Sequence, residues 1–165
     1  MSVEKVTLTG ASETLNAGWT KHNTNVDYLV CGDGAGTRYL RAMKVAIKNG
    51  TTAETIKPSG TSIYNSDAVT EENNLGQSGD TGNFSLDATK SKLHISADGI
   101  TGTVTNVLMA SIIENASGNV IHVDATVVSS GIQLEFTHND ASAYDLTEAV
   151  DVGEIYVQVM YLTSS

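Results

Sequence analysis

Apolar residues along this chain recur at every second position within short runs, and clusters of Gly, Asn, Ser and Asp separate the runs. An alternation with period two is typical of half-buried β-strands, whereas no run of helical length repeats every three to four residues. The pattern predicts strands at 5–9, 14–20, 26–31, 39–48, 52–57, 92–96, 102–114, 120–128, 132–137 and 154–162. Many short strands separated by turn residues indicate an all-β fold, an antiparallel β-sandwich or a jelly-roll-like single domain.

The two strands around the turn Ser129–Gly131 predict their own register. Their apolar positions must face the same side of the sheet, because side chains alternate between faces. The register that achieves this pairs Val127 with Ile132 and Val123 with Phe136 across a four-residue loop. The same reasoning places seven residues in the core of the sandwich: Leu108, Ile112, Val123, Leu134, Phe136, Val157 and Val159.

The segments 104–113 and 155–162 carry apolar side chains on both faces. An antiparallel strand of this kind is central in a sandwich or buried against another subunit. A monomer that exposed so much apolar surface would be prone to aggregation. The sequence therefore predicts a homo-oligomer.

A long polar and acidic segment spans 58–92 and has little strand signal. Loops of more than ~15 residues inside a compact domain are usually functional or disordered. Its centre supplies the candidate partner-binding residues Glu71, Glu72, Asn73 and Asn74. A solvated loop that contacts nothing is the alternative.

The 165 residues make one domain, 1–165, with a formal net charge of −10 and only nine Lys and Arg. Nucleic-acid binding needs clustered basic residues, so neither DNA nor RNA is an expected partner. No run approaches the ~20 apolar residues of a membrane span, and no secretory signal opens the chain. One cysteine forms no disulfide framework. We expect synthesis in a host cytoplasm and no membrane partner.

The glycine-rich run Gly32–Gly36 resembles a phosphate loop only superficially. A dinucleotide fingerprint needs a third glycine where Thr37 stands, and a Walker loop needs Gly-Lys-Ser/Thr. A helix over 38–48 fits some of the following apolar residues, but their alternation and the Asn49–Gly50 turn signal favour a strand and a tight hairpin. The run is interpreted as a turn between two strands, and Cys31 as an inert buried thiol.

The remaining polar residues suggest neither catalysis nor a cofactor. In the predicted register His122 lies opposite Thr137, and His138 falls on the other face, so the two imidazoles point apart. Asp124 and Glu135 oppose each other on an exposed face. Three oxygen-bearing residues lack the spacing of a calcium loop: Asn139, Asp140 and Asp145. We expect no enzyme, no metal site and no cofactor.

In style, and most clearly over residues 119–163, the chain resembles the small structural proteins of tailed bacteriophages, especially capsid decoration (cement) proteins. The resemblance implies a virion protein, often a trimer, that binds the major capsid protein on the capsid surface. Tail-tube and fibre proteins share the style. A carbohydrate-binding or adhesin-like β-sandwich is the alternative from another class, and an enzyme that uses Cys31 ranks third.

Overall fold

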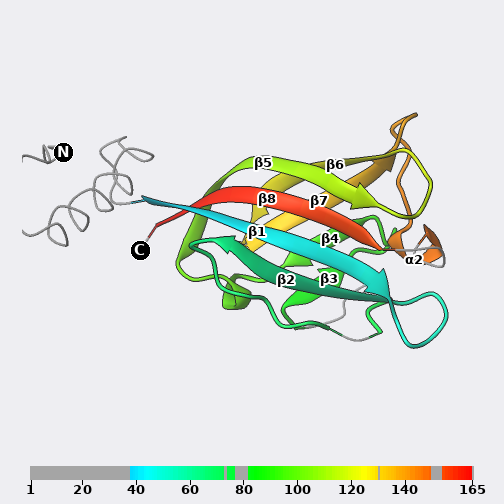
Figure 1. The fold of residues 1–165 in the computed structure, drawn as a ribbon, viewed down its shortest axis with the longest axis horizontal. Coiled ribbons are helices and arrows are strands. Elements are labelled where there is room, and N and C mark those ends of the chain that lie inside the picture. The colour runs from blue at the N-terminus through cyan, green and yellow to red at the C-terminus, as the bar shows by residue number, and fades with distance from the viewer. Residues whose placement is uncertain (1–37, 73, 77–81, 130, 150–153, 165) are drawn as a thin grey trace, which may run out of the picture.

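The structure, a computed structural model, describes residues 38–72, 74–76, 82–129, 131–149 and 154–164. Over these residues the chain forms two four-stranded antiparallel sheets that pack face to face, with sheet A overlying sheet B in Figure 1. This confirms the predicted all-β, sandwich-like fold. Sheet A has the order β2-β1-β8-β5 and consists of β2 (Ile56–Tyr64), β1 (Arg38–Asn49), β8 (Ile155–Ser164) and β5 (Thr103–Asn115). Sheet B has the order β3-β4-β7-β6 and consists of β3 (Phe84–Leu86), β4 (Lys92–Ile95), β7 (Gly131–His138) and β6 (Ile121–Val128).

Hairpins join β1 to β2, β3 to β4 and β6 to β7, and the other connections cross from one sheet to the other. Two short helical turns, η2 (Ala97–Gly99) and α2 (Leu146–Ala149), lie in crossing connections. In the described ranges no helix has the length and hydropathy that crossing a membrane requires. The expected strands at 5–9, 14–20 and 26–31 lie outside the described residues.

The core lies between the sheets and is built from the alternating inward positions of their strands. In β1 and β8 these are odd-numbered residues from Met43 to Ile47 and from Ile155 to Tyr161. Of the residues that we predicted for the core, Ile112 and Val123 are partly buried and pack against it. Four others are fully buried: Leu134, Phe136, Val157 and Val159.

The predicted register of β6 and β7 is confirmed. Val127 pairs with Ile132, and Val123 pairs with Phe136. Pairing continues for one residue pair beyond the prediction, because Val128 also pairs with Gly131. The connection is therefore tighter than the four-residue loop that the hydrophobic pattern predicts.

The β1–β2 hairpin is confirmed, but its predicted tight Asn49–Gly50 turn is wrong. Asn49 pairs with Ile56, so residues 50–55 form the connection, which the backbone N–H of Gly50 closes by donating to Thr55 O at 2.8 Å. The positive φ falls on Glu54, at 58°. The predicted loop 58–92 is also interrupted, because β2 runs through to Tyr64 and β3 lies within it.

Leu108 is not a core residue, contrary to the prediction. β5 contains three β-bulges against β8, at which one extra residue of β5 enters the strand: Thr105, Leu108 and Ile113. Each extra residue shifts the alternation of the strand, so Val107, Ala110 and Ile112 face the core. Leu108 is left 52% exposed, and Ile113 51% exposed.

Candidate functional site

The segment that follows β2 packs along the outer edge of that strand. Ile56 and Leu75 exchange two backbone hydrogen bonds, and so do Gly60 and Val69. The side chains of Val69 and Leu75 are buried in the core. The alternative of a solvated loop that contacts nothing is therefore wrong for this segment.

Two predicted partner-binding residues on this segment make contacts within the chain. Glu71 forms an ion pair with Lys57 of β2 at 3.0 Å. The backbone N–H of Glu72 donates to Pro58 O, and its carboxylate Oε1 accepts from the backbone N–H of Asn83 at 2.9 Å. These contacts hold the segment against β2, and a role in binding a partner stays a prediction.

The other two predicted residues are amides. Asn73 lies outside the described residues. Asn74 has a positive φ of 58°, and its Oδ1 accepts from the backbone N–H of Thr51 at 2.8 Å and from the Thr51 hydroxyl at 2.6 Å. Asn74 therefore ties the segment to the β1–β2 loop.

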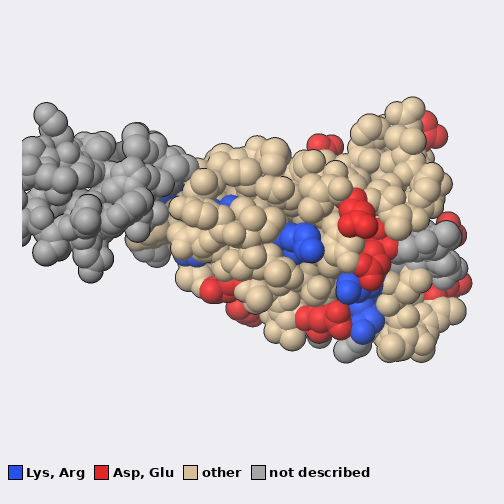
Figure 2. All heavy atoms as spheres, in the orientation of Figure 1, with Lys and Arg blue, Asp and Glu red and all other residues tan. Residues whose placement is uncertain are grey.

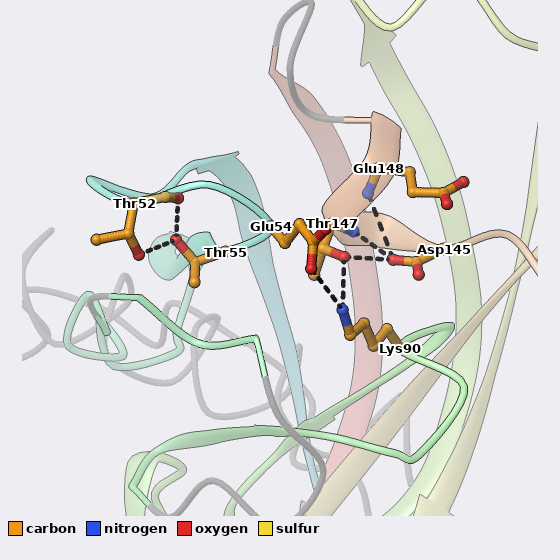
Figure 3. Close-up of polar contacts among 7 residues, drawn as sticks. All are labelled: Thr52, Glu54, Thr55, Lys90, Asp145, Thr147 and Glu148. Carbon is orange, nitrogen blue, oxygen red and sulfur yellow. Dashed lines mark hydrogen bonds and ion pairs between the residues drawn. The ribbon is translucent and has the colours of Figure 1, made fainter.

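At one end of the sandwich, side chains from three separate connections meet (Figure 3). Lys90, in the β3–β4 turn, donates from Nζ to the hydroxyl of Thr147 at 3.3 Å and lies 4.0 Å from the carboxylate of Glu54. The Thr147 hydroxyl donates to Oδ1 of Asp145 at 2.6 Å. Asp145 Oδ1 also accepts the backbone N–H of Thr147 at 2.8 Å, as the N-cap of α2.

The combination of threonine, lysine and aspartate in this cluster resembles the components of a nucleophilic site. A nucleophile, however, must reach a substrate and pass its proton to a base. Thr147 is only 3% exposed, and Lys90 donates to it rather than accepting from it. The cluster therefore joins the β1–β2 loop, the β3–β4 turn and α2 and has no catalytic geometry.

The two histidines of the second half make separate contacts. His122 Nε2 lies 3.3 Å from Oδ1 of Asn139, while the ring of His138 meets the ring of Tyr144 edge-on at 4.9 Å. Among the described residues, no three His, Cys, Asp or Glu side chains gather as metal ligands would.

The carboxylates of the 138–145 loop also serve local turns. Hydrogen bonds from the hydroxyl and then from the backbone N–H of Ser142 lower the pKa of Asp140. Asp140 and Asp145 therefore cap different turns of the same loop, which is the behaviour of an ordinary polar loop.

Asp124 and Glu135 face each other across β6 and β7, as predicted. Lys92 pairs with Glu135 from the other side, and its Nζ lies 3.2 Å from the carboxylate. The lysine offsets the repulsion between the two acids, so the outer face of sheet B carries an exposed charge row. Such exposed pairs contribute ~0–1 kcal/mol each to stability.

The largest uncharged feature is a row of side chains on the outer face of sheet A. Cross-strand partners share a face, and here Ala42 pairs with Tyr64 and Met160, which in turn pairs with Met109. The row therefore crosses all four strands, and we call it the apolar row: Tyr64, Ala42, Met160 and Met109. Leu40 and Leu162 pair in the next outward-facing row.

Charged side chains are unevenly distributed on this face. In Figure 2 most of them gather from the centre of the sheet toward the end where β1 finishes and β2 begins. The visible described surface toward the other end, where the apolar row lies, is largely uncharged.

Both edges of sheet A extend this apolar surface through β-bulges. At the β2 edge Ile63 is the extra residue between the pairs Ala42–Tyr64 and Met43–Ser62, and it is 50% exposed. At the β5 edge Leu108 and Ile113 occupy the same kind of position. Sequence reasoning missed this surface; the only signal was the run of apolar residues on both faces of 104–113.

A hollow of about 210 Å³ opens beside the segment that follows β2. Asp67, Thr70, Asn83 and Asp98 contribute to its lining. These side chains offer oxygen atoms but neither a base–nucleophile pair nor a ligand cluster. Cys31 and the Gly32–Gly36 run lie outside the described residues, so their interpretation stays a prediction.

Comparison of the chain with protein-family descriptions, with curated proteins and with solved structures finds no match. The function is therefore argued from the chain's own residues.

Proposed function

We propose that this chain is a structural virion protein, an oligomeric decoration (cement) protein that binds the major capsid protein on a phage capsid surface and stabilises the shell. The observation that carries the proposal is the apolar row, which ends at both edges of sheet A in exposed aliphatic side chains. A surface of this kind on a soluble domain marks a protein–protein contact. The resemblance in sequence style supplies the phage context.

The rigid sandwich suits a clamping role. Joined subunits can bind a repeating lattice at several points, and weak individual contacts then add up to strong attachment. The net charge of −10 favours basic patches on the partner and disfavours adhesion to nucleic acid.

A carbohydrate-binding module would present aromatic side chains to sugar rings. Among the described residues Tyr64 is the one aromatic side chain in the exposed class, and it lies in the apolar row. A single exposed tyrosine supports protein contact better than a sugar platform, so the decoration role is preferred.

The test is to mix the purified protein with undecorated phage heads, sediment the heads and measure the bound protein. We expect saturable binding and a higher temperature of head rupture. Protein that stays in the supernatant and leaves the rupture temperature unchanged would end the proposal. A glycan array run in parallel tests the carbohydrate alternative directly.

A further inference from the structure

We infer that copies of this chain associate head to tail, with the β5 edge of one copy packed against the β2 edge of the next. The inference rests on the proposed oligomeric role and specifies the contact. The β5 edge surface consists of Leu108, Met109 and Ile113. The β2 edge surface consists of Ile63 and Tyr64. All five side chains are exposed.

The two edge surfaces lie at the same level of sheet A. Tyr64 and Met109 are the two ends of the apolar row, and Ile63 and Leu108 are the bulge residues next to them. Two copies side by side would therefore bring apolar side chains against apolar side chains without a shift along the strands.

Charges next to the two surfaces are complementary. At the β5 edge Arg38 Nη1 donates to Oδ1 of Asn106 at 3.2 Å, which places a positive charge one row from Met109. At the β2 edge Ser66 donates from its hydroxyl to Ala42 O at 2.7 Å, and Asp67 follows it. A head-to-tail contact brings the arginine of one copy near the aspartate of the next.

Contacts between like edges are disfavoured by the same charges. Two β5 edges would place arginine beside arginine, and two β2 edges would place aspartate beside aspartate. Like charges in an interface suppress the wrong pairing. In a chain with a net charge of −10, an edge that carries a cation is a suitable partner for an acidic edge.

The bulges determine how the edges meet. A regular edge strand can add another strand through its free backbone groups, but a bulge interrupts the ladder and twists the edge away. β5 carries three bulges against β8, and β2 carries one against β1. The contact is therefore made by side chains. A head-to-tail contact of this kind forms a closed ring when the rotation per subunit allows it, and a trimer is the expected ring.

The experiment uses two full-length variants, Leu108→Asp at the β5 edge and Ile63→Asp at the β2 edge. Each position is about half exposed, so the monomer fold is expected to survive, as far-UV circular dichroism will verify. Each variant alone loses its oligomer, as measured by light scattering. Mixed in equal amounts, they form a dimer and no larger species, because each copy retains one intact edge of opposite kind.

Val120→Asp is the matched control, since Val120 is 67% exposed and lies in the β5–β6 connection, outside both edge surfaces. It is expected to assemble like the unmodified chain. If an Asp variant fails to fold, Leu108→Ser and Ile63→Ser replace the pair.

Several outcomes would overturn the inference: either edge variant still assembling alone, the mixture staying monomeric, or the unmodified chain being a monomer. Binding to phage heads is measured separately. A monomer that binds heads would remove this inference and leave the decoration role, whereas an oligomer that ignores heads would do the reverse.

Discussion

Tyr64 and Met109 lie at opposite edges of sheet A yet belong to one cross-strand row, joined through Ala42 and Met160. The row is apolar from edge to edge, although the chain carries a net charge of −10. Both of its ends are exposed, at 45% for Tyr64 and 41% for Met109. An arrangement that leaves apolar side chains at both edges of a sheet gives this sandwich two surfaces for protein contact.

The exposure of Leu108 predicts a small effect on stability. Replacing Leu108 by Ala removes a side chain that is half in water, so the free energy of unfolding of the monomer should change by only about 0.5 kcal/mol. Leu134→Ala is the matched comparison, because Leu134 is fully buried and its loss should cost about 2–5 kcal/mol. Urea unfolding of both variants at a concentration where the protein is monomeric checks the difference. Equal losses would contradict the bulge assignment in β5.

Gly131 begins β7 at a point where no side chain fits. A Cβ there would lie 2.3 Å from the carbonyl oxygen of Ile95, so Gly131→Ala should destabilise the fold by about 3 kcal/mol. Gly118→Ala meets no atom within 4 Å and suffers only from its φ of +76°, which should cost about 1 kcal/mol. Thermal unfolding gives the order of the two. A smaller loss for the Gly131 variant would show that β4 and β7 are farther apart than described.

Asp87 predicts an acid-dependent contribution from the β3–β4 turn. Burial opposes its charge, but hydrogen bonds from the Thr89 hydroxyl and from the backbone N–H groups of Lys92, Thr89 and Ser91 outweigh it, so the pKa of Asp87 falls below 3.8. A carboxyl with a lowered pKa in the folded state stabilises the fold above its unfolded pKa and loses that contribution as the pH falls through the folded value.

The matching variant is Asp87→Asn. It should be less stable than the unmodified chain at pH 6, and the gap should narrow as the pH falls from about 5 to about 2, because the unmodified chain then loses its carboxylate. Urea unfolding at several pH values measures this gap. A gap that stays constant with pH would show that the carboxylate charge has no role in the turn.

Tyr161 predicts the opposite behaviour at alkaline pH. Burial raises the pKa of Tyr161 to about 12. The folded state therefore favours the protonated phenol, and its contribution is complete below the unfolded pKa of about 10 and is lost as the pH rises through about 12. Tyr161→Phe does not ionise, so it should keep its stability over that window while the unmodified chain declines. Parallel decline of both proteins would contradict the assignment.

The sequence predicted the fold class and one register because both follow from local alternation. The strands β6 and β7 have polar outward positions and apolar inward positions, so a one-residue slip would bury His122 and Asp124. Only one pairing of these two strands keeps those residues in water.

The bulges of β5 were beyond prediction from the sequence. In 104–113 both faces are apolar, so alternation does not indicate which residue leaves the ladder. The choice depends on how β5 twists against β8, which is a tertiary property. The packed segment after β2 is a different case, since Val69 and Leu75 are isolated apolar residues in polar surroundings and both are buried. Treated as anchors, they would have predicted its attachment.

The most direct test of the account is the mass of the unmodified chain in solution, measured by light scattering over a range of concentrations. The account predicts an oligomer, with three times the 17.3 kDa chain mass as the expected value. It also predicts that Leu108→Asp and Ile63→Asp each reduce this mass to that of one chain, while Val120→Asp does not. A single 17.3 kDa species at every concentration would contradict it.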